Sequence, residues 1–284
     1  MARPAHTRPT RTLFAVGVAT ILGAACTRER PPAEHSARTR EAAAATLPAP
    51  GAARATATLD AEDGQWTMPA KSYSAIRYSQ LTQITTANVA QLKPAWTFST
   101  SVLRGHEEGP LVVNNTMYIV TPFPNLLYAL DLTKPGAPTK WTYNPKPAQA
   151  SQGVACCDVV NRGAVYADGK IVYNTLDDHV VAVDANTGKE VWKTKVGDIN
   201  VGETMTMAPL VVKNKVLVGV SGGEMGVRGW LKALDLGSGQ VAWTAYGTGP
   251  DADVKIGPRF KAFYPKDRGK DLGTSMTSPS LIPS

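Results

Sequence analysis

The chain has 284 residues, of which 43% are hydrophobic and 19% are charged, and its net charge is +7. Most of this positive charge lies in the first 59 residues, which contain eight arginines and three acidic residues, whereas the remainder holds 22 basic and 20 acidic residues. A nearly neutral body without a basic stripe argues against a nucleic-acid partner.

The N-terminus has the features of an export signal. Arg3, Arg8 and Arg11 precede an apolar stretch over residues 13–25, which ends in small residues and is too short to span a bilayer. We therefore predict a signal peptide at residues 1–25 and a periplasmic location. Cys26 follows, with two alternatives: a lipidated first residue that tethers the mature chain to a membrane, or a residue beside an ordinary cleavage site. Residues 26–61 are rich in Ala, Pro and Arg and predict a disordered linker.

The remainder of the chain, residues 62–284, contains an internal repeat. Four tryptophans are spaced 45, 51 and 51 residues apart, at Trp96, Trp141, Trp192 and Trp243. The last three end related phrases at residues 129–141, 182–192 and 233–243. In each phrase we expect the Asp to accept hydrogen bonds in a turn, the Gly to adopt a positive φ, and the Trp to pack between neighbouring units.

Short β-branched runs precede each of these phrases and predict further strands. They occupy residues 111–113 and 117–120, 164–166 and 171–173, and 210–212 and 216–220. Four short strands in a period of about 50 residues are typical of a β-propeller blade. Three such blades can be recognised, whereas propellers close with about four to eight. We therefore predict an all-β chain that forms the N-terminal part of a longer propeller, with a short helix before it at residues 86–92.

Two adjacent cysteines, Cys156 and Cys157, are unusual in the second unit. Exported chains meet oxidising conditions, and processing or lipidation at Cys26 leaves these two residues as each other's only stable partners. A direct disulfide between them closes a strained ring, which chains rarely keep without a purpose at a site. The alternative is two small buried thiols that happen to be neighbours.

Four phrases, in order along the chain, resemble those of the quinoprotein alcohol dehydrogenases, the pyrroloquinoline quinone (PQQ) dependent methanol and ethanol dehydrogenases. The phrases are residues 104–107, 156–163, 202–209 and 221–229. The resemblance implies an eight-bladed propeller with Trp docking motifs. It also implies oxidation of a primary alcohol to the aldehyde, with PQQ and a calcium or lanthanide ion as cofactors and a cytochrome c as electron acceptor.

The resemblance also assigns site residues. It implies that a disulfide between Cys156 and Cys157 stacks on the PQQ ring, that Arg162 pairs with its carboxylates, and that Glu224 ligates the metal ion. The remaining residues assigned to the cofactor rim are Glu107, Thr206, Ser221, Gly222 and Gly223. The alternatives are a surface salt bridge for Arg162 and a strand hydroxyl for Thr206. Glu108 has no counterpart in the pattern, and we expect it to be solvated.

No catalytic residue is assigned within this chain. The family's catalytic Asp, its Asn metal ligand and the Trp on the opposite face of PQQ have no match here, and Asp158 does not fit the catalytic position. We therefore expect that the chain alone does not turn over alcohol. Two other readings remain: a non-catalytic, lipid-anchored β-propeller scaffold of outer-membrane assembly, and a remnant gene product without a function of its own.

Overall fold

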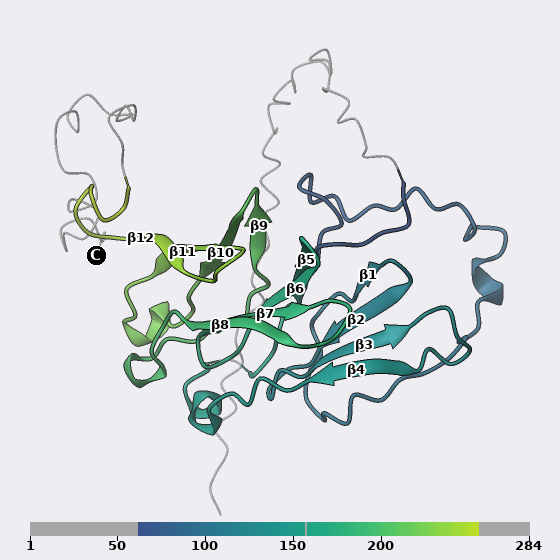
Figure 1. Cartoon of the computed structure of the whole chain (residues 1–284), viewed down its shortest axis with the longest axis horizontal. Helices are drawn as coiled ribbons and strands as arrows, with labels where there is room; N and C mark the ends of the chain where they lie inside the picture. The colour runs from purple at the N-terminus through teal and green to yellow at the C-terminus, as the bar shows by residue number, and fades with distance from the viewer. Residues whose placement is uncertain (1–61, 157, 256–284) are drawn as a thin grey trace, which may run out of the picture. The chain divides into compact units, whose positions relative to one another are not determined.

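Three four-stranded antiparallel sheets follow one another along the chain (Figure 1). The computed structural model describes residues 62–156 and 158–255. The first sheet contains β1 (Leu111–Val113), β2 (Thr116–Val120), β3 (Leu127–Asp131) and β4 (Thr139–Tyr143). The second contains β5 (Ala164–Ala167), β6 (Lys170–Asn174), β7 (His179–Asp184) and β8 (Glu190–Lys195). The third contains β9 (Leu210–Val212), β10 (Lys215–Gly219), β11 (Trp230–Asp235) and β12 (Val241–Tyr246). Each sheet pairs its strands in chain order, so the prediction of three blades is confirmed.

The turn between the last two strands of a blade is built as its sequence predicts. In the second blade, Asp184 Oδ1 accepts the backbone N–H groups of Asn186 and Thr187 at 3.1 and 2.8 Å, and Gly188 has a φ of +71°. The third blade repeats this arrangement with Asp235 and with Gly239, whose φ is +72°. Glycine adopts a positive φ without the steric cost that a Cβ brings, which explains its place in both phrases.

A Trp near the middle of the last strand docks each blade on the next. Trp141 Nε1 donates to the carbonyl of Ala185 at 3.2 Å, and Trp192 Nε1 donates to the carbonyl of Leu236 at 3.0 Å. Both indole rings lie against a glycine of the following blade, so the predicted packing is confirmed. Trp243, the corresponding tryptophan of the third blade, is 39% exposed, and no further sheet follows it within the described residues.

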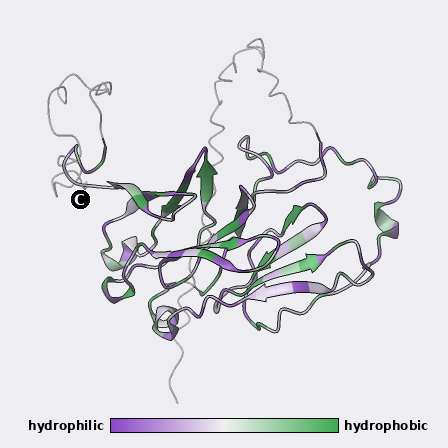
Figure 2. Ribbon diagram, viewed as in Figure 1, coloured by the Kyte–Doolittle hydropathy of each residue, from purple (hydrophilic) through white to green (hydrophobic). Residues whose placement is uncertain are grey.

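The hydrophobic core lies between blades rather than within one of them. One cluster joins the first and second blades through residues such as Leu111, Leu127 and Ile171, and another joins the second and third through Val172, Val216 and Leu234. The innermost strands β1, β5 and β9 lie next to one another, and Figure 2 shows predominantly apolar residues on several of the inner strands. The stack of blades therefore fixes the position of the loops at their ends.

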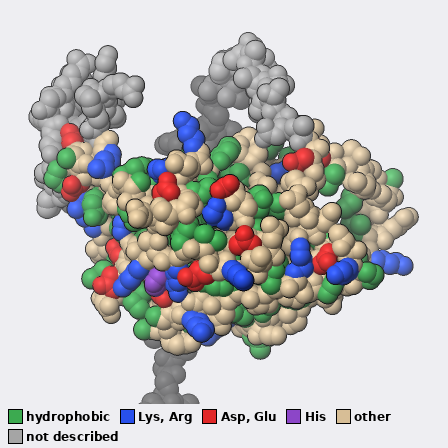
Figure 3. All heavy atoms as spheres, viewed as in Figure 1, with side chains coloured by type: hydrophobic (Ala, Val, Ile, Leu, Met, Phe, Trp, Pro, Cys, Tyr) green, Lys and Arg blue, Asp and Glu red, His purple; other side chains and the backbone are tan. Residues whose placement is uncertain are grey.

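Within the described residues, four short 3₁₀ helices lie outside the sheets: η1 (Val89–Gln91), η2 (Gln149–Gly153), η3 (Ile199–Val201) and η4 (Gly223–Met225). The predicted helix at residues 86–92 is thus wrong in type and length, because only one 3₁₀ turn forms there. No helix among the described residues is long and apolar enough to cross a membrane. Acidic and basic side chains are interspersed on the face in Figure 3, in agreement with a nearly neutral body. The predicted signal peptide, linker and final residues 256–284 lie outside the described residues.

Candidate functional site

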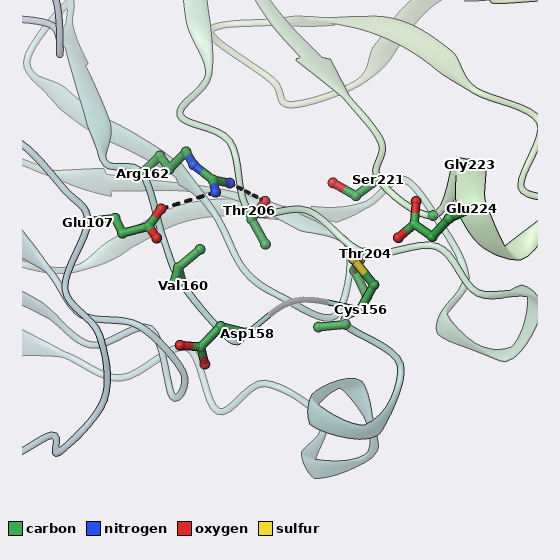
Figure 4. Close-up of a pocket in the computed structure, with 12 residues that line it drawn as sticks. Glu107, Cys156, Asp158, Val160, Arg162, Thr204, Thr206, Ser221, Gly223 and Glu224 are labelled. Atoms are coloured by element: carbon green, nitrogen blue, oxygen red, sulfur yellow. Dashed lines mark hydrogen bonds and ion pairs between the residues drawn. The ribbon is translucent and has the colours of Figure 1, made fainter. Parts of the chain in front are cut away.

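A pocket of about 430 Å³ lies where loops of all three blades meet. The segments that enclose it precede the innermost strands β1, β5 and β9 or follow β10. Its lining residues are Glu107, Ala155, Cys156, Asp158, Val160, Arg162, Thr204, Thr206, Ser221, Gly222, Gly223 and Glu224. Every predicted site residue that the structure describes therefore lines one pocket, although these residues come from four separate segments (Figure 4).

Arg162 links two of these segments on one side of the pocket. Its Nη2 lies 3.0 Å from Glu107 Oε2, and its Nη1 donates to Thr206 Oγ1 at 2.7 Å. The backbone N–H of Arg162 also donates to the carbonyl of Thr206 at 2.9 Å. The guanidinium is half exposed, and because it has five N–H donors, these two side-chain contacts leave donors for a ligand.

The opposite side is formed by the loop after β10. Figure 4 shows Ser221, Gly223 and Glu224 across the pocket from Arg162. Gly222 has a φ of +111°, and a Cβ there would lie 2.8 Å from Val227 and would collide with the carbonyl of Gly202. Only glycine allows this close packing of backbone. A Cβ on Gly223, in contrast, would meet nothing within 4 Å, so the backbone is open to a ligand there.

Thr204 is one of four lining residues that were not predicted from the sequence; the others are Ala155, Asp158 and Val160. Thr204 is buried, it pairs with Ser221 in an isolated β-bridge, and its carbonyl accepts the N–H of Ser221 at 2.9 Å. This bridge joins the segment before β9 to the loop after β10 and so holds two walls of the pocket together. Its position inside the 202–209 phrase was the available signal, because the neighbouring Thr206 was assigned from that phrase.

Cys156 lies on the wall between these two sides and is disulfide-bonded. Cys157, its predicted partner, lies outside the described residues. Asp158 also lines the pocket, with a φ of +153°, and its Oδ1 accepts the N–H of Val159. The pocket therefore combines a rigid sulfur-containing wall with carboxylates, a guanidinium and hydroxyl groups.

The prediction that Glu108 is solvated is wrong. Its carboxyl oxygen Oε1 is buried and has no hydrogen-bond partner among the described residues. Burial raises the pKa of Glu108 to about 8, although a hydrogen bond from the backbone of Val120 opposes this effect. Its neighbour Glu107 faces the pocket instead. The two carboxylates thus lie in different environments although they are adjacent in the chain.

The pocket lining combines one guanidinium, hydroxyl groups and the carboxylates of Glu107, Asp158 and Glu224. Open backbone lies at Gly223, and the disulfide-bonded Cys156 adds a polarisable sulfur atom to the wall. Glu224 places a carboxylate, an oxygen ligand of the kind that hard cations prefer, in the pocket lining. No group of three or more His, Cys, Asp or Glu side chains that could hold a metal ion occurs among the described residues, so any metal ion here needs ligand atoms from elsewhere.

These features define a β-propeller protein with a ligand pocket at the loop ends of its blades. The family described as PQQ, glucose/ethanol/alcohol dehydrogenase, β-propeller domain, matches residues 66–259. The chain belongs to this family.

Similar proteins agree with that assignment. A lanthanide-dependent methanol dehydrogenase of Methylacidiphilum fumariolicum is 54% identical over 216 residues, which cover 76% of this chain and 35% of the relative. Subunit 1 of the methanol dehydrogenase (cytochrome c) of Methylobacterium organophilum is 49% identical, and the match covers 76% of this chain and 36% of that subunit.

Among solved structures, a europium-containing methanol dehydrogenase superposes with a TM-score of 0.66 at 57% identity, covering 67% of this chain and 33% of that one. The chain thus spans about a third of the length of the relatives it matches.

Proposed function

We propose that this chain is the N-terminal portion of a PQQ-dependent alcohol dehydrogenase that oxidises a primary alcohol of the methanol or ethanol type. The observation that carries the proposal is the single pocket into which Glu107, Cys156, Arg162, Thr206 and the 221–224 segment converge. Further support comes from relatives named as methanol dehydrogenases at about half sequence identity. We further propose an eight-bladed propeller for the whole protein, to which this chain contributes three blades.

The residues present fit PQQ, which carries three carboxylates and an ortho-quinone. Arg162 would bind a carboxylate by charge-assisted hydrogen bonds, which are stronger than neutral ones. Thr206 and Ser221 would donate hydroxyl groups, and Gly222 and Gly223 would let backbone N–H groups approach the cofactor. Cys156, disulfide-bonded to Cys157 in this proposal, would form the wall against one face of the ring.

Glu224 would hold the metal ion, calcium or a lanthanide. One relative is named lanthanide-dependent and one solved structure contains europium. Hard cations prefer oxygen ligands and take six to eight of them, so Glu224 would share the ion with cofactor oxygens and with residues outside this chain.

PQQ bound in this pocket would accept the two electrons of the alcohol as a hydride, and a cytochrome c would remove them, as the name of one relative suggests. The residues of this chain would orient the cofactor and would exclude water from one of its faces. Glu107 fixes the guanidinium of Arg162 across the pocket rim, with a distance of 3.0 Å. No general base for the alcohol proton is assigned within this chain.

The remaining organisation is proposed on sequence grounds alone. Residues 1–25 would be a signal peptide, residues 26–61 a linker, and residues 62–284 the propeller portion of a periplasmic protein. Cys26 would provide a membrane tether if it is lipidated. The alternative, a non-catalytic scaffold, gives no reason for a disulfide-bonded cysteine, an arginine and a glutamate in one pocket, and we do not favour it.

Binding of PQQ to the purified chain tests the proposal. We expect binding in the presence of Ca²⁺ or La³⁺, measured by calorimetry, with at least tenfold weaker affinity in Arg162→Ala, since charge-assisted hydrogen bonds each contribute about 1.5–3 kcal/mol. Lys189→Ala is the matched control, because Lys189 is an exposed cation in the turn before β8, outside the pocket.

Equal affinities of the Arg162→Ala and Lys189→Ala variants would contradict the assigned pocket. Loss of metal-dependent enhancement in Glu224→Gln, with PQQ binding retained, would support Glu224 as the ligand. Absence of any PQQ binding by a folded chain would leave the scaffold reading as the better one.

A further inference from the structure

A second group of ionisable side chains lies behind the pocket wall, between the second and third blades. Its centre is Asp178, in the turn between β6 and β7, which is fully buried. Both carboxyl oxygens of Asp178 lack a hydrogen-bond partner among the described residues. An ionised carboxylate without donors is strongly disfavoured in the protein interior, so this geometry favours the protonated acid.

Glu203 is the acidic neighbour whose charge acts most strongly on Asp178, and the two carboxyl groups converge on Gly197. A Cβ at Gly197 would lie 2.8 Å from Asp178 Cγ and 2.8 Å from Glu203 Oε2. Asp178 Cγ and Glu203 Oε2 are therefore separated by at most twice 2.8 Å. Glu203 is well supplied with donors: Oε2 accepts the N–H of Asp198 at 2.7 Å, and Oε1 accepts Trp230 Nε1 at 2.9 Å. Glu203 is thus the member of the pair better suited to remain ionised.

The surrounding charges act in both directions on Asp178. Its pKa is raised to about 7, first by burial and then by the negative charges of Glu203 and Asp177, while Lys195 and Lys232 oppose the shift. Lys232 Nζ lies 4.0 Å from the centroid of a Trp230 ring and donates to the carbonyl of Val196.

The two remaining neighbours are already engaged. Asp177 lies 3.2 Å from His179 Nδ1 and accepts hydrogen bonds from Thr175 and Ala148. Lys195 lies 3.8 Å from Asp198.

The pair is connected to the pocket through the chain itself. Glu203 directly precedes Thr204, which lines the pocket and whose carbonyl accepts the N–H of Ser221. We propose that Asp178 keeps its proton beside the ionised Glu203 and that this pair thereby positions the pocket wall at Thr204, so that release of the proton to solvent loosens the wall. Asp178 is in this view a positioning residue. The proposal does not depend on the identity of the ligand.

The first experiment locates the proton. Infrared spectra of the full chain without ligand detect the carbonyl stretch of a protonated carboxylic acid, recorded at about pH 6 and about pH 9, on either side of the pKa of about 7. In the wild type, the band of protonated Asp178 should be present at the lower pH and absent at the higher pH. In Asp178→Asn this band should be absent at both pH values. Glu108→Gln is the control, because it removes the other described carboxylic acid with a raised pKa, about 8, without touching the pair. An unchanged band in Asp178→Asn would overturn the proposal.

The second experiment tests the coupling to the pocket wall. Hydrogen exchange of the Ser221 amide, corrected for the intrinsic pH dependence of exchange, should show about tenfold or greater loss of protection in the wild type as the pH rises from about 6 to about 9. Asp178→Asn mimics the protonated acid and should keep its protection at both pH values. Equal pH dependence in the two proteins would refute the coupling. Failure of Asp178→Asn to fold would also refute it, because a neutral isostere should be tolerated.

Discussion

The contact between Trp192 and Gly239 predicts the cost of a single methyl group between the second and third blades. A Cβ on Gly239 would lie 2.6 Å from the Cδ2 and Cε3 atoms of Trp192 and 2.9 Å from Thr194 Oγ1. Carbon atoms in favourable contact are about 3.5–4.0 Å apart, so in Gly239→Ala the indole must move by about 1 Å. That movement also disturbs the hydrogen bond from Trp192 Nε1 to the carbonyl of Leu236, which is 3.0 Å long.

Two effects add in Gly239→Ala. The left-handed conformation at φ +72° costs an L-residue about 1–2 kcal/mol, and overpacking of a filled interface costs about 1–3 kcal/mol more. Gly169→Ala separates these effects, because Gly169 has nearly the same φ, +71°, and a Cβ there would meet nothing within 4 Å. We therefore expect losses of about 2–5 kcal/mol for Gly239→Ala and about 1–2 kcal/mol for Gly169→Ala.

Urea unfolding followed by circular dichroism measures this difference. With a denaturant dependence of about 2–3 kcal/mol per molar urea, an additional loss of about 2 kcal/mol lowers the unfolding midpoint by about 0.7–1 M below that of Gly169→Ala. Equal midpoints for the two variants would show that the Trp–Gly contact does not fasten the blades together, and the docking argument would fail.

Two further predictions concern the buried tryptophan and the buried acid. Trp192→Ala should lower the free energy of unfolding by about 3–5 kcal/mol, as expected for a large aromatic core residue. Trp243→Ala should lower it by about 1 kcal/mol or less, because that residue is 39% exposed. Similar losses for the two variants in urea titrations would contradict this contrast. Glu108 has a raised pKa in the folded state, from 4.5 to about 8, so its stabilising effect is complete below about pH 4.5 and is lost as the pH rises through about 8. Between about pH 6 and pH 9 the wild type should therefore lose about 2–3 kcal/mol more stability than Glu108→Gln, and parallel pH profiles of the two proteins would disprove the assignment.

Much of the blade structure was predictable because it is local. The pairs of β-branched runs, the Asp168–Gly169 turn and the Asp-to-Trp phrases lie within a few residues of each other in sequence and in space. The presence of these strands could therefore be predicted from the residue pattern, and the predicted strand ends lie within about one or two residues of those observed. The weakest local prediction was the helix at residues 86–92, where neither an apolar face nor a core partner supports more than the 3₁₀ turn Val89–Gln91.

The members of the candidate site were also named from the sequence, but through resemblance rather than through local pattern. Nothing in the residues 104–109 distinguishes a carboxylate that faces the pocket from one that is buried, and Glu108 was placed wrongly for that reason. The two adjacent side chains differ in environment because the loop lies between the pocket and the blade interior. Thr204 was missed because a buried threonine acquires its role only from the bridge to Ser221.

The amino-acid sequence by itself determined the all-β class, the number of recognisable blades and the Trp and Gly positions that join them, because turn chemistry and strand alternation act over a few residues. Only the tertiary structure decided which loop residues meet. Glu107 and Arg162 are 55 positions apart, and Asp178 and Glu203 are 25 apart, yet each pair is in close proximity. Such proximity follows from the angle and distance at which whole blades stack, and these depend on the packing of the cores between blades rather than on any short stretch of chain.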